Sequence, residues 1–394
     1  MTEPKVTIDP RLVDAVLLLV PQDDSVASLT RRLRDAGVEA TSGEAEPDPK
    51  RLRELATSIG MRAERCAVIA DDPDAVVAAR SGGFSLVIGA VPDGLRASGS
   101  SAGDDLLEHG ADVVIDDIAD VAVRTGDRRM SDIPNALESY AGVAASFEGG
   151  VPAVCLDYDG TLSDIVADPD AAGLVDGADA ALARLAGQCP VAILSGRDLA
   201  DIRERVAVPG LWYAGSHGFE SIAPDGSYRQ NEDAAAAVPV LERAAQELRE
   251  ALANISGSRV EHKRFAVAVH YRDVAADDVG AVVASTYRVG RRERLRVTNG
   301  RKVVELRPDV DWNKGTTLAW IRDQIEQSQP VLPVYIGDDL TDEDAFDAVR
   351  TDGIGILVRH TEDGDRRSAA QYTLENPNQV RVFLDRLADD LPAS

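Results

Sequence analysis

Hydrophobic and polar residues alternate in two patterns along most of this chain. Short runs of β-branched and aliphatic residues are followed by segments in which apolar side chains recur every three or four positions. The first pattern is typical of buried strands and the second of amphipathic helices, so their alternation predicts a parallel α/β sheet. One helical segment covers residues 26–37 and is expected to end at Gly37. The strands expected in this first third are residues 14–20, 66–70 and 84–91.

The alternation lapses around residues 125–150 and then begins again. Within the lapse, residues 133–146 are interpreted as a connecting helix that ends before Gly149 and Gly150. From Val151 onward, strands are again followed by loops or helices of the same style. The strand-containing segments expected there are residues 151–161, 190–197, 211–218, 332–346 and 353–358.

Residues from about 223 to 305 follow a different pattern. Residues 238–255 predict one long amphipathic helix, and residues 259–274 alternate as a half-exposed strand should. Residues 294–308 predict a hairpin with Asn299 and Gly300 at its turn. Helices packed on one face of an antiparallel sheet would form a small inserted lid.

Two segments far apart in the chain resemble each other. Residues 63–90 and 332–358 share the order of an apolar strand, two aspartates, a helix, a glycine turn and a second apolar strand. The first third is therefore interpreted as a second copy of the later fold. Its first strand continues into Pro21-Gln22-Asp23-Asp24, where the later copy has Asp157-Tyr158-Asp159-Gly160-Thr161. We expect no metal-bound nucleophile in the first copy.

The composition narrows the classes of partner. The chain has 42 basic and 68 acidic residues and a formal net charge of −26, which disfavours binding to nucleic acids and to anionic membranes. Aromatic residues make up only 4%, so any platform for stacking sugars or bases would be small. No apolar leader begins the chain, and no run approaches the ~18 apolar residues of a membrane span. The three cysteines are interpreted as packing residues, and the expected location is the cytoplasm.

An aspartate pair follows the strand that begins at Val151. Asp157 and Asp159 are one residue apart, directly before Gly160-Thr161. Two such carboxylates repel each other and lose hydration, so they normally need a cation or a proton between them. Open α/β sheets bind ligands at this end of a strand. Taken alone, the pair could also be an acidic turn.

Three further patterns complete a candidate site. Ser195-Gly196 closes a strand, where the hydroxyl and the glycine N–H could bind a phosphate oxygen, or could simply form a turn. Lys314 begins a helix, where its charge opposes the helix dipole unless a phosphate or carboxylates lie beside it. A group of acids follows the strand near residue 335 and suits a hard cation such as Mg²⁺. Those acids include Asp338, Asp339 and Asp342.

In this order, the four patterns resemble the motifs of the haloacid dehalogenase superfamily of phosphohydrolases, with its larger α/β cap. Further stretches are similar to trehalose-6-phosphate phosphatases over roughly residues 151–390. They read SGR (195–197), GSHG (215–218), GRKVVELRP (300–308) and YIGDDLTDEDAF (335–346).

The resemblance implies an α/β fold with a parallel-sheet Rossmannoid core, an inserted α+β cap and a second, degenerate Rossmannoid domain before it. The N-terminal domain would cover residues 1–125 and a linker helix residues 126–150. The catalytic core would cover residues 151–222 and 306–394, and the cap residues 223–305.

The resemblance also implies roles for the core residues. Asp157 would attack phosphorus and form an aspartyl phosphate, and Asp159 would act as the general acid and base. Asp157, the backbone carbonyl of Asp159 and Asp338 would hold Mg²⁺, supported by Asp339 and Asp342. Ser195 and Lys314 would hold the transferring phosphoryl group, and Thr161 would orient the nucleophile. Gly196, Arg197 and His217 would contact the substrate.

The lid is expected to decide which sugar is hydrolysed. Acidic and basic side chains at strand spacing can hydrogen-bond sugar hydroxyls from both sides, although each could equally belong to an ordinary polar strand face. The candidates are Glu261, Lys263, His270, Lys302 and Glu305.

Several functions stay open at this point. The resemblance favours a Mg²⁺-dependent phosphatase for trehalose 6-phosphate in trehalose biosynthesis, with a functional link to a trehalose-6-phosphate synthase. Sucrose phosphate or a glucosylglycerate phosphate is an alternative substrate. A phosphomutase would share the nucleophile but must exclude water. A regulatory or scaffold protein would fit the first third better than the whole chain.

Overall fold

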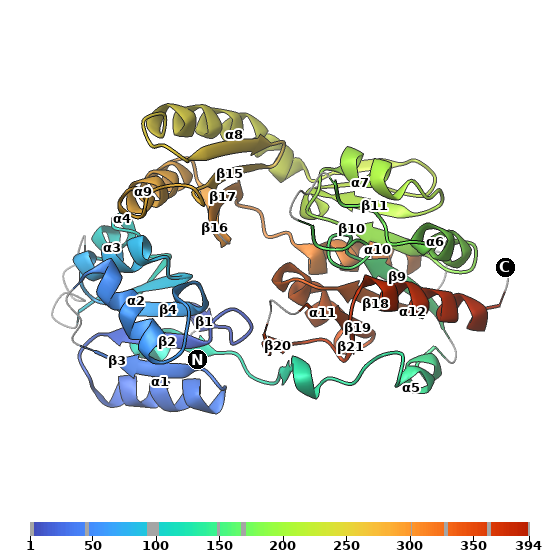
Figure 1. The fold of residues 1–394 in the computed structure, drawn as a ribbon, viewed down its shortest axis with the longest axis horizontal. Coiled ribbons are helices and arrows are strands. Elements are labelled where there is room, and N and C mark those ends of the chain that lie inside the picture. Colours follow the sequence, from blue (N-terminus) through green and yellow to red (C-terminus); the bar gives the residue numbers. More distant parts are fainter. Residues whose placement is uncertain are drawn as a thin grey trace. The chain divides into compact units, whose positions relative to one another are not determined.

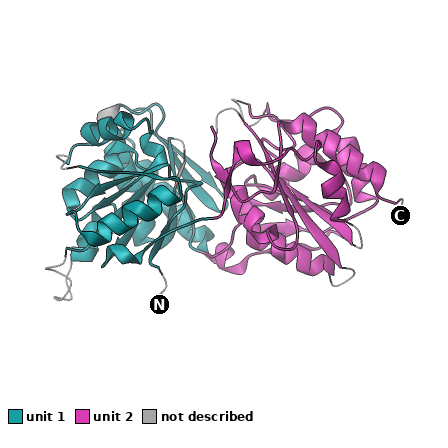
Figure 2. Ribbon diagram, turned by 90° about the horizontal axis from the view of Figure 1, so that it is seen from below, with its two compact units in different colours: residues 1–125, 237–309 teal, residues 126–236, 310–394 magenta. Residues whose placement is uncertain are grey.

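The computed structural model describes residues 4–43, 47–92, 102–147, 150–166, 171–300, 302–326, 330–360 and 364–392. The chain divides into two compact units, coloured teal and magenta in Figure 2. Unit 1 consists of Met1–Thr125 and Ala237–Asp309, and unit 2 of Gly126–Ala236 and Val310–Ser394. The sequence segment interpreted as a lid therefore belongs to the same unit as the N-terminal third.

Unit 1 contains a five-stranded sheet in which every neighbouring pair is parallel, in the order β3-β2-β4-β5-β6. Figure 1 labels β2, β3 and β4 of this sheet. Its central strands are apolar on both faces because helices cover both, as the continuous apolar runs predict. Its strands are β2 (Ala15–Leu19), β3 (Glu39–Ser42), β4 (Cys66–Ala70), β5 (Leu86–Ala90) and β6 (Val113–Ile115). Its helices are α1 (Asp24–Asp35), α2 (Pro49–Ser58), α3 (Pro73–Gly82) and α4 (Ala102–Glu108), and β1 (Val6–Ile8) pairs with β7 (Val121–Val123).

The rest of unit 1 is a four-stranded antiparallel sheet in the order β14-β15-β17-β16, backed by two helices. Val267, Val269 and Leu306 point to one face and pack against Leu241 and Leu248 of the first helix. The other face carries the polar side chains of alternate positions. The elements are α8 (Glu232–Ala251), β14 (Arg259–Lys263), β15 (Ala266–His270), α9 (Ala276–Arg292), β16 (Leu295–Gly300) and β17 (Val303–Pro308).

Helix α9 of this lid packs against α3 of the N-terminal sheet. A side chain at Gly280 would place its Cβ 2.8 Å from the Ser81 hydroxyl, so the glycine permits a close approach of the two helices. Nearby, the Arg80 guanidinium lies 4.7 Å from the centroid of the Tyr287 ring and forms an ion pair with Asp112. The Tyr287 hydroxyl donates to Asp112 Oδ1 at 3.2 Å. These contacts explain why the lid and the N-terminal sheet form one unit.

Unit 2 is built around an eight-stranded sheet in the order β13-β12-β11-β10-β9-β18-β19-β21. The six strands β11, β10, β9, β18, β19 and β21 run parallel to one another. At the β11 side of the sheet, β12 is antiparallel to β11, and β13 is antiparallel to β12. The strands are β9 (Val151–Leu156), β10 (Val191–Leu194), β11 (Trp212–Gly215), β12 (Glu220–Ile222), β13 (Tyr228–Gln230), β18 (Val331–Gly337), β19 (Ile354–Val358) and β21 (Tyr372–Leu374). The helices are α5 (Tyr140–Ala145), α6 (Ala178–Ala186), α7 (Leu199–Val206), α10 (Lys314–Glu326), α11 (Glu343–Val349) and α12 (Pro377–Asp390), and β8 (Arg128–Arg129) pairs with β20 (Arg367–Ser368).

The two parallel sheets share one topology. In unit 1 the second, first, third, fourth and fifth strands in chain order lie side by side as β3-β2-β4-β5-β6. In unit 2 the strands β10-β9-β18-β19-β21 repeat that order, with the lid segment inserted in the chain between β10 and β18. The predicted α/β fold with two Rossmannoid domains and an α+β cap is therefore confirmed.

Three local predictions need correction. Residues 259–274 do not form one strand, because the chain reverses at Arg264-Phe265 and β14 pairs with β15. Asn299 and Gly300 lie within β16 rather than at the hairpin turn, since Gly300 pairs with Val303. The connecting helix is only α5, whose Tyr140 and Val143 are buried in the core of unit 2.

The expected domain limits stay a prediction. Strand β13 extends the unit 2 sheet beyond residue 223, where the sequence suggests that the lid begins, and unit 1 resumes at Ala237.

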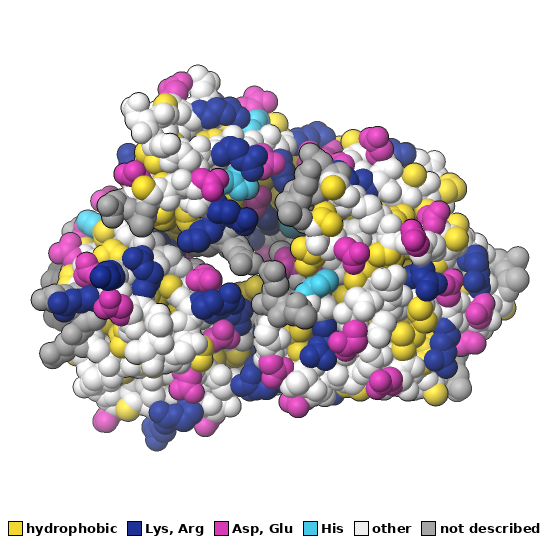
Figure 3. All heavy atoms as spheres, viewed as in Figure 1, with side chains coloured by type: hydrophobic (Ala, Val, Ile, Leu, Met, Phe, Trp, Pro, Cys, Tyr) yellow, Lys and Arg dark blue, Asp and Glu magenta, His cyan; other side chains and the backbone are white. Residues whose placement is uncertain are grey.

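Within the described residues, no helix is both long and apolar enough to cross a membrane. On the face shown in Figure 3, acidic and basic side chains are interspersed.

Candidate active site

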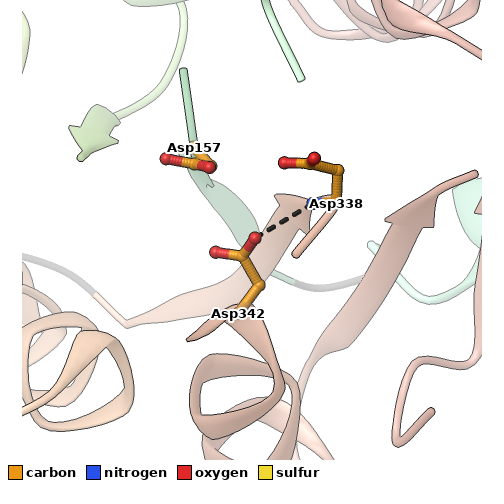
Figure 4. A group of neighbouring side chains, drawn as sticks. All are labelled: Asp157, Asp338 and Asp342. Carbon is orange, nitrogen blue, oxygen red and sulfur yellow. Dashed lines mark hydrogen bonds between the residues drawn. The ribbon is translucent and has the colours of Figure 1, made fainter. Parts of the chain in front are cut away.

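The candidate residues of unit 2 gather at the carboxyl edge of its sheet. Asp157 directly follows β9, Ser195 follows β10 and Asp338 follows β18, and these three strands are neighbours. One carboxylate oxygen each of Asp157, Asp338 and Asp342 lies within 4.8 Å of the others, and all three side chains are buried (Figure 4). Buried carboxylates this close need positive charge among them.

Lys314 supplies part of that charge. It is the first residue of α10 and is only 3% exposed, and its Nζ lies 3.1 Å from Asp157 Oδ1 and 2.6 Å from Asp342 Oδ1. Burial alone would lower the pKa of Lys314, but the charges of Asp157 and Asp342 outweigh burial and raise it. The lysine is therefore held as a cation between the two carboxylates.

Asp342 has its hydrogen-bonding capacity filled by the protein. Its Oδ1 accepts from Lys314 Nζ at 2.6 Å and from the Tyr335 hydroxyl at 2.5 Å. Its Oδ2 accepts from the backbone N–H groups of Asp338 at 3.0 Å and Asp339 at 2.9 Å, the first of which is drawn in Figure 4. A carboxylate offers about four lone-pair sites, and all four are used here. Asp342 is thus suited to positioning Lys314 and the loop after β18 rather than to binding a cation.

Asp338 is held in place from the backbone side. Arg366 Nη2 donates to the Asp338 carbonyl at 3.1 Å, and Arg366 forms a buried ion pair with Glu343. Burial raises the pKa of the Asp338 carboxyl group to about 6, and the charge of Asp342 adds to this effect, while a hydrogen bond with His360 opposes it. Burial also raises the pKa of Asp157, with Lys314 opposing it.

The chemistry of this donor set fits a divalent metal ion. Asp157 and Asp338 offer carboxylate oxygens in a buried place where their own charges are destabilised, and hard cations prefer oxygen ligands. A bound cation would stabilise the ionised forms of both carboxyl groups and so offset the effect of burial on their pKa values. Asp339, by contrast, is exposed, and its Oδ1 accepts from the Leu340 N–H at 2.6 Å as a helix cap.

Asp159 lies apart from this cluster in a separate ion pair. Arg197 donates to both of its carboxylate oxygens, from Nε at 2.8 Å and from Nη2 at 2.7 Å, and to Asp201 at 3.1 Å. The Asp159 side chain is 46% exposed. Ser195 is buried beside this pair, and its Oγ accepts from the Arg197 N–H at 3.1 Å. The loops after β9 and β10 are therefore joined by charge and by a hydrogen bond.

Two glycines leave room that the site needs. Gly160 has a φ of +74°, and a Cβ there would lie 2.1 Å from Asp338 Oδ2. A Cβ at Gly196 would lie 2.8 Å from the ring of His217, which itself has a φ of +56°. Thr161, completely buried, donates from its hydroxyl to Asp338 Oδ1 at 3.4 Å. Glycine is required at Gly160 because the backbone approaches a carboxylate of the cluster.

Comparison of the sequence with those of known proteins identifies the family. Residues 155–378 match the family model of trehalose-phosphatase. The chain is 54% identical over 391 residues to the trehalose-phosphate phosphatase of Mycobacterium avium, covering 98% of this chain and 97% of that one. It is 51% identical over 388 residues to the Mycobacterium tuberculosis protein of the same name, covering 98% and 96%. The chain belongs to the trehalose-phosphatase family.

Solved structures support the same fold. The trehalose-6-phosphate phosphatase of Aspergillus fumigatus is 26% identical, with a TM-score of 0.50, and the match covers 65% of this chain and 99% of that one. About a third of this trehalose-phosphatase family member thus lies outside that match.

The structure adds residues that the sequence analysis missed. His360 follows β19, and its Nε2 lies 3.0 Å from the Gly160 carbonyl and 3.4 Å from Asp338 Oδ2. The buried pair of Glu343 and Arg366 holds the loop of Asp338, and Glu343 also accepts from the Ala369 N–H at 2.9 Å. His360 had a signal in the sequence, because it follows a buried parallel strand. No local pattern marks Arg366.

The lid candidates of the trehalose-phosphatase fold lie on one sheet of unit 1. Glu261 and Glu305 both pair with Ala268, from opposite sides, so they share a face. On that face, Glu261 lies 2.9 Å from His270 Nε2 and 3.8 Å from Lys263 Nζ. Glu305 forms an ion pair with Arg307, which the sequence analysis did not single out. The fifth candidate, Lys302, is exposed and precedes β17.

Proposed function

We propose that this protein hydrolyses trehalose 6-phosphate at the carboxyl edge of the unit 2 sheet, with Asp157 as the nucleophile. The observation that carries the proposal is the buried contact between Asp157 and Lys314, 3.1 Å apart, beside Asp338 in a chain of the trehalose-phosphatase family. The substrate is proposed from the names of the relatives, which are trehalose-phosphate phosphatases. This chain matches them over nearly their full length.

The environment of Asp157 suits attack on phosphorus. Its side chain is 7% exposed, so few water molecules compete for it, and Lys314 keeps a positive charge at its Oδ1. In the proposed reaction, one Asp157 oxygen attacks in line and forms an aspartyl phosphate as the sugar oxygen departs. Lys314 and Ser195 hold the phosphoryl oxygens, because phosphoryl transfer depends mainly on position and charge. Thr161 and Asp342 keep the neighbouring groups in place.

Asp159 is proposed as the acid that protonates the departing sugar oxygen and then as the base that activates water. To do so, its carboxyl group must part from Arg197, which holds both of its oxygens in this structure. The phosphoryl group offers Arg197 an alternative anionic partner of suitable geometry. We therefore propose that Arg197 turns from Asp159 to the substrate during the reaction. Gly196 lies in the same loop, and His217, which follows β11, packs against that loop.

Mg²⁺ is the cation we propose for the site, held by Asp157, Asp338 and the backbone carbonyl of Asp159, with Asp339 and Asp342 supporting the loop. When bound, it supplies positive charge that stabilises the developing charge on the phosphoryl oxygens. His360 and Arg366 keep the Asp338 loop in position. These two side chains take no part in the reaction itself. They matter because a small displacement of a carboxylate ligand weakens cation binding.

Sugar recognition is proposed for the polar face of the lid sheet. Glu261, Lys263 and His270 form one hydrogen-bonding group there, and Glu305 with Arg307 forms a second. Paired donors and acceptors of this kind can bracket sugar hydroxyls. Lys302 stays a candidate from the sequence. Sites built for hydroxyl groups reject molecules that lack them by factors of up to about 10⁴.

The test is phosphate release from a panel of sugar phosphates by the full-length protein. The panel contains trehalose 6-phosphate, sucrose 6-phosphate, a glucosylglycerate phosphate and glucose 6-phosphate, each with MgCl₂, CaCl₂ or EDTA. We expect kcat/KM for trehalose 6-phosphate to exceed that for each other sugar by at least about 100-fold, and we expect EDTA to abolish turnover. Preference for another sugar phosphate would contradict the proposed substrate, and full activity in EDTA would contradict the proposed requirement for a cation.

A further inference from the structure

A second pocket lies in unit 2, at the opposite edge of the sheet from the catalytic residues. Its volume is about 670 Å³. It is lined by the loop before β10, the start of β11, the turn between β12 and β13, the first residues of β13, and one side of α10. Ser195 follows the carboxyl end of β10, whereas Gln188 of the pocket precedes its amino end. Because a four-residue strand spans about 13 Å, the pocket and the active site are separate.

The pocket collects aromatic side chains in a chain that has few. The sequence contains three tryptophans, and Trp212 and Trp320 both line this pocket. Their rings meet edge to face, with centroids 5.8 Å apart, and both are only partly buried. Tyr228 stands on the rim and is 52% exposed. These rings leave apolar surface open to a ligand instead of filling the core.

A fixed arginine forms part of the wall. The Arg229 guanidinium lies 4.3 Å from the centroid of Trp320 and 4.9 Å from that of Trp312. All three tryptophans therefore lie in or directly behind this wall. The two cation–π contacts hold the guanidinium against the tryptophans, and its N–H groups are hydrogen-bond donors in the wall of the pocket.

The polar groups suit a neutral ligand. The lining includes one acidic side chain, Asp225, and one basic side chain, Arg229, whose charges cancel. Gln324 adds an amide group, which can both donate and accept hydrogen bonds, whereas the Gln188 amide already donates to the Ala388 carbonyl at 2.9 Å. A phosphate or nucleotide would need an excess of positive charge, whereas a sugar needs apolar faces for its C–H groups and mixed donors and acceptors for its hydroxyls.

We propose that this pocket binds an unphosphorylated sugar of one or two pyranose rings, which stacks on Trp320 and Tyr228 and hydrogen-bonds to Asp225, Arg229 and Gln324. The volume lies within the range of about 300–1,000 Å³ that is typical of small-molecule sites. The inference does not rest on the proposed phosphatase reaction, because its ligand carries no phosphate and its residues are not those of the catalytic edge.

Binding can be measured with the full-length protein in EDTA. The tryptophans are the natural probe, since two of them line the pocket and the third lies behind Arg229. Trehalose, maltose and glucose are titrated while tryptophan emission is recorded, with glycerol and inorganic phosphate as control titrants, and calorimetry repeats the titrations. We expect a saturable change with a Kd below about 10 mM for at least one disaccharide, and none for the two controls.

Matched variants locate the binding. Tyr228→Ala and Gln324→Ala should each raise the Kd at least about tenfold, whereas Tyr228→Phe, which keeps the ring, should change it less than about threefold. Asp323→Ala is the control on α10, because Asp323 is exposed and does not line the pocket. All four variants should keep phosphatase activity within about twofold.

Three outcomes would overturn the proposal. The first is the absence of a saturable signal for any of the sugars in both measurements. The second is binding that Tyr228→Ala and Gln324→Ala leave unchanged. The third is binding that Asp157→Asn removes, since that would place the sugar in the active site instead. Phosphatase assays on the same variants keep this outcome distinct from a failure of the proposed reaction.

Discussion

The two parallel sheets of this protein have the same strand order but use the residues at their carboxyl edges differently. In unit 1, Asp23 after the first strand accepts from the Val26 N–H at 2.8 Å, and Asp72 after the third accepts from the Asp74 N–H at 3.2 Å, both as helix caps. Asp71, which directly follows β4, is only half-buried. In unit 2 the corresponding strands, β9 and β18, lead to Asp157 and Asp338, which are buried beside each other.

The lysines show the same contrast. Lys50 lies in the first turn of α2, the helix before β4, and its side chain is 79% exposed beside Glu54. Lys314 begins α10, the helix before β18, and its side chain is 3% exposed between two carboxylates. A charged residue at a strand end or helix start is therefore not a catalytic signal by itself. The two edges differ in burial: at the edge of unit 2, burial raises the pKa of both Asp157 and Asp338, while Lys314 stays charged beside them.

The largest expected effect comes from the first-strand aspartates. Asp157→Asn replaces the nucleophile with an amide that cannot form an aspartyl phosphate, so kcat should fall by at least about 10³. Asp23→Asn is the matched change in unit 1, and asparagine caps a helix as well as aspartate does. Activity and melting temperature of Asp23→Asn should match wild type. Steady-state phosphate release checks both, and turnover by Asp157→Asn within tenfold of wild type would remove Asp157 from its role.

The lysines come next. Lys314→Met leaves Asp157 and Asp342 buried without their cation, so the free energy of unfolding should fall by about 3 kcal/mol or more, together with activity. Lys50→Met removes only an exposed charge and should change stability by less than about 0.5 kcal/mol. Urea unfolding of both variants tests the contrast. Equal losses would mean that the edge of unit 1 is organised by charge as much as that of unit 2.

The third prediction concerns pH. Burial raises the pKa of Asp338 to about 6 from a usual value of 3.8. Between these two pH values, the carboxyl group is therefore protonated in the native protein but ionised in the unfolded chain. Stability from this group is therefore complete below pH 3.8 and is lost as the pH rises through 6. Asp338→Asn avoids the buried charge, so without metal it should be more stable than wild type at pH 8 by about 2–3 kcal/mol.

The gain from Asp338→Asn should vanish near pH 4, where wild type is protonated, although the variant should be inactive throughout. Asp71→Asn in unit 1 is the control, since burial raises the pKa of Asp71 in the same direction but that side chain is less buried. Its gain should be smaller. Thermal unfolding in EDTA between pH 4 and 8 measures both, and a gain for Asp338→Asn that does not depend on pH would contradict the assignment.

The carboxyl-edge position of the site could be predicted from the sequence, but the division of labour within it could not. Apolar runs ending at Leu156, Leu194 and Gly337 marked strand ends that meet at one edge. That Asp342 is filled by four donors depends on Tyr335 and Lys314, which converge only after folding. In the same way, Asp159 faces Arg197 because β9 and β10 pair in one register, and no spacing within one segment reveals that contact.

The packing of the lid on the N-terminal sheet was also invisible in the sequence. Periodicity shows which face of a helix is apolar but not which distant helix it meets. The sequence analysis assigned no element to the segment around Gly280, and only the structure shows that this glycine lies on α9 and faces Ser81. Tyr287, beside Arg80 and Asp112, is likewise explained by a neighbour far away in the chain.

The smallest expected effect tests whether the N-terminal sheet of unit 1 stabilises the lid. Tyr287→Phe removes only the hydroxyl that donates to Asp112, which should cost about 1 kcal/mol and speed amide exchange about fivefold. If the N-terminal sheet and the lid open together, exchange should quicken equally in α3, β5 and α9. Tyr213→Phe is the control in unit 2, where the hydroxyl donates to the Val208 carbonyl at 2.7 Å, and it should leave exchange in unit 1 unchanged. Faster exchange confined to α9 would mean that the lid opens by itself and that the N-terminal sheet does not support it.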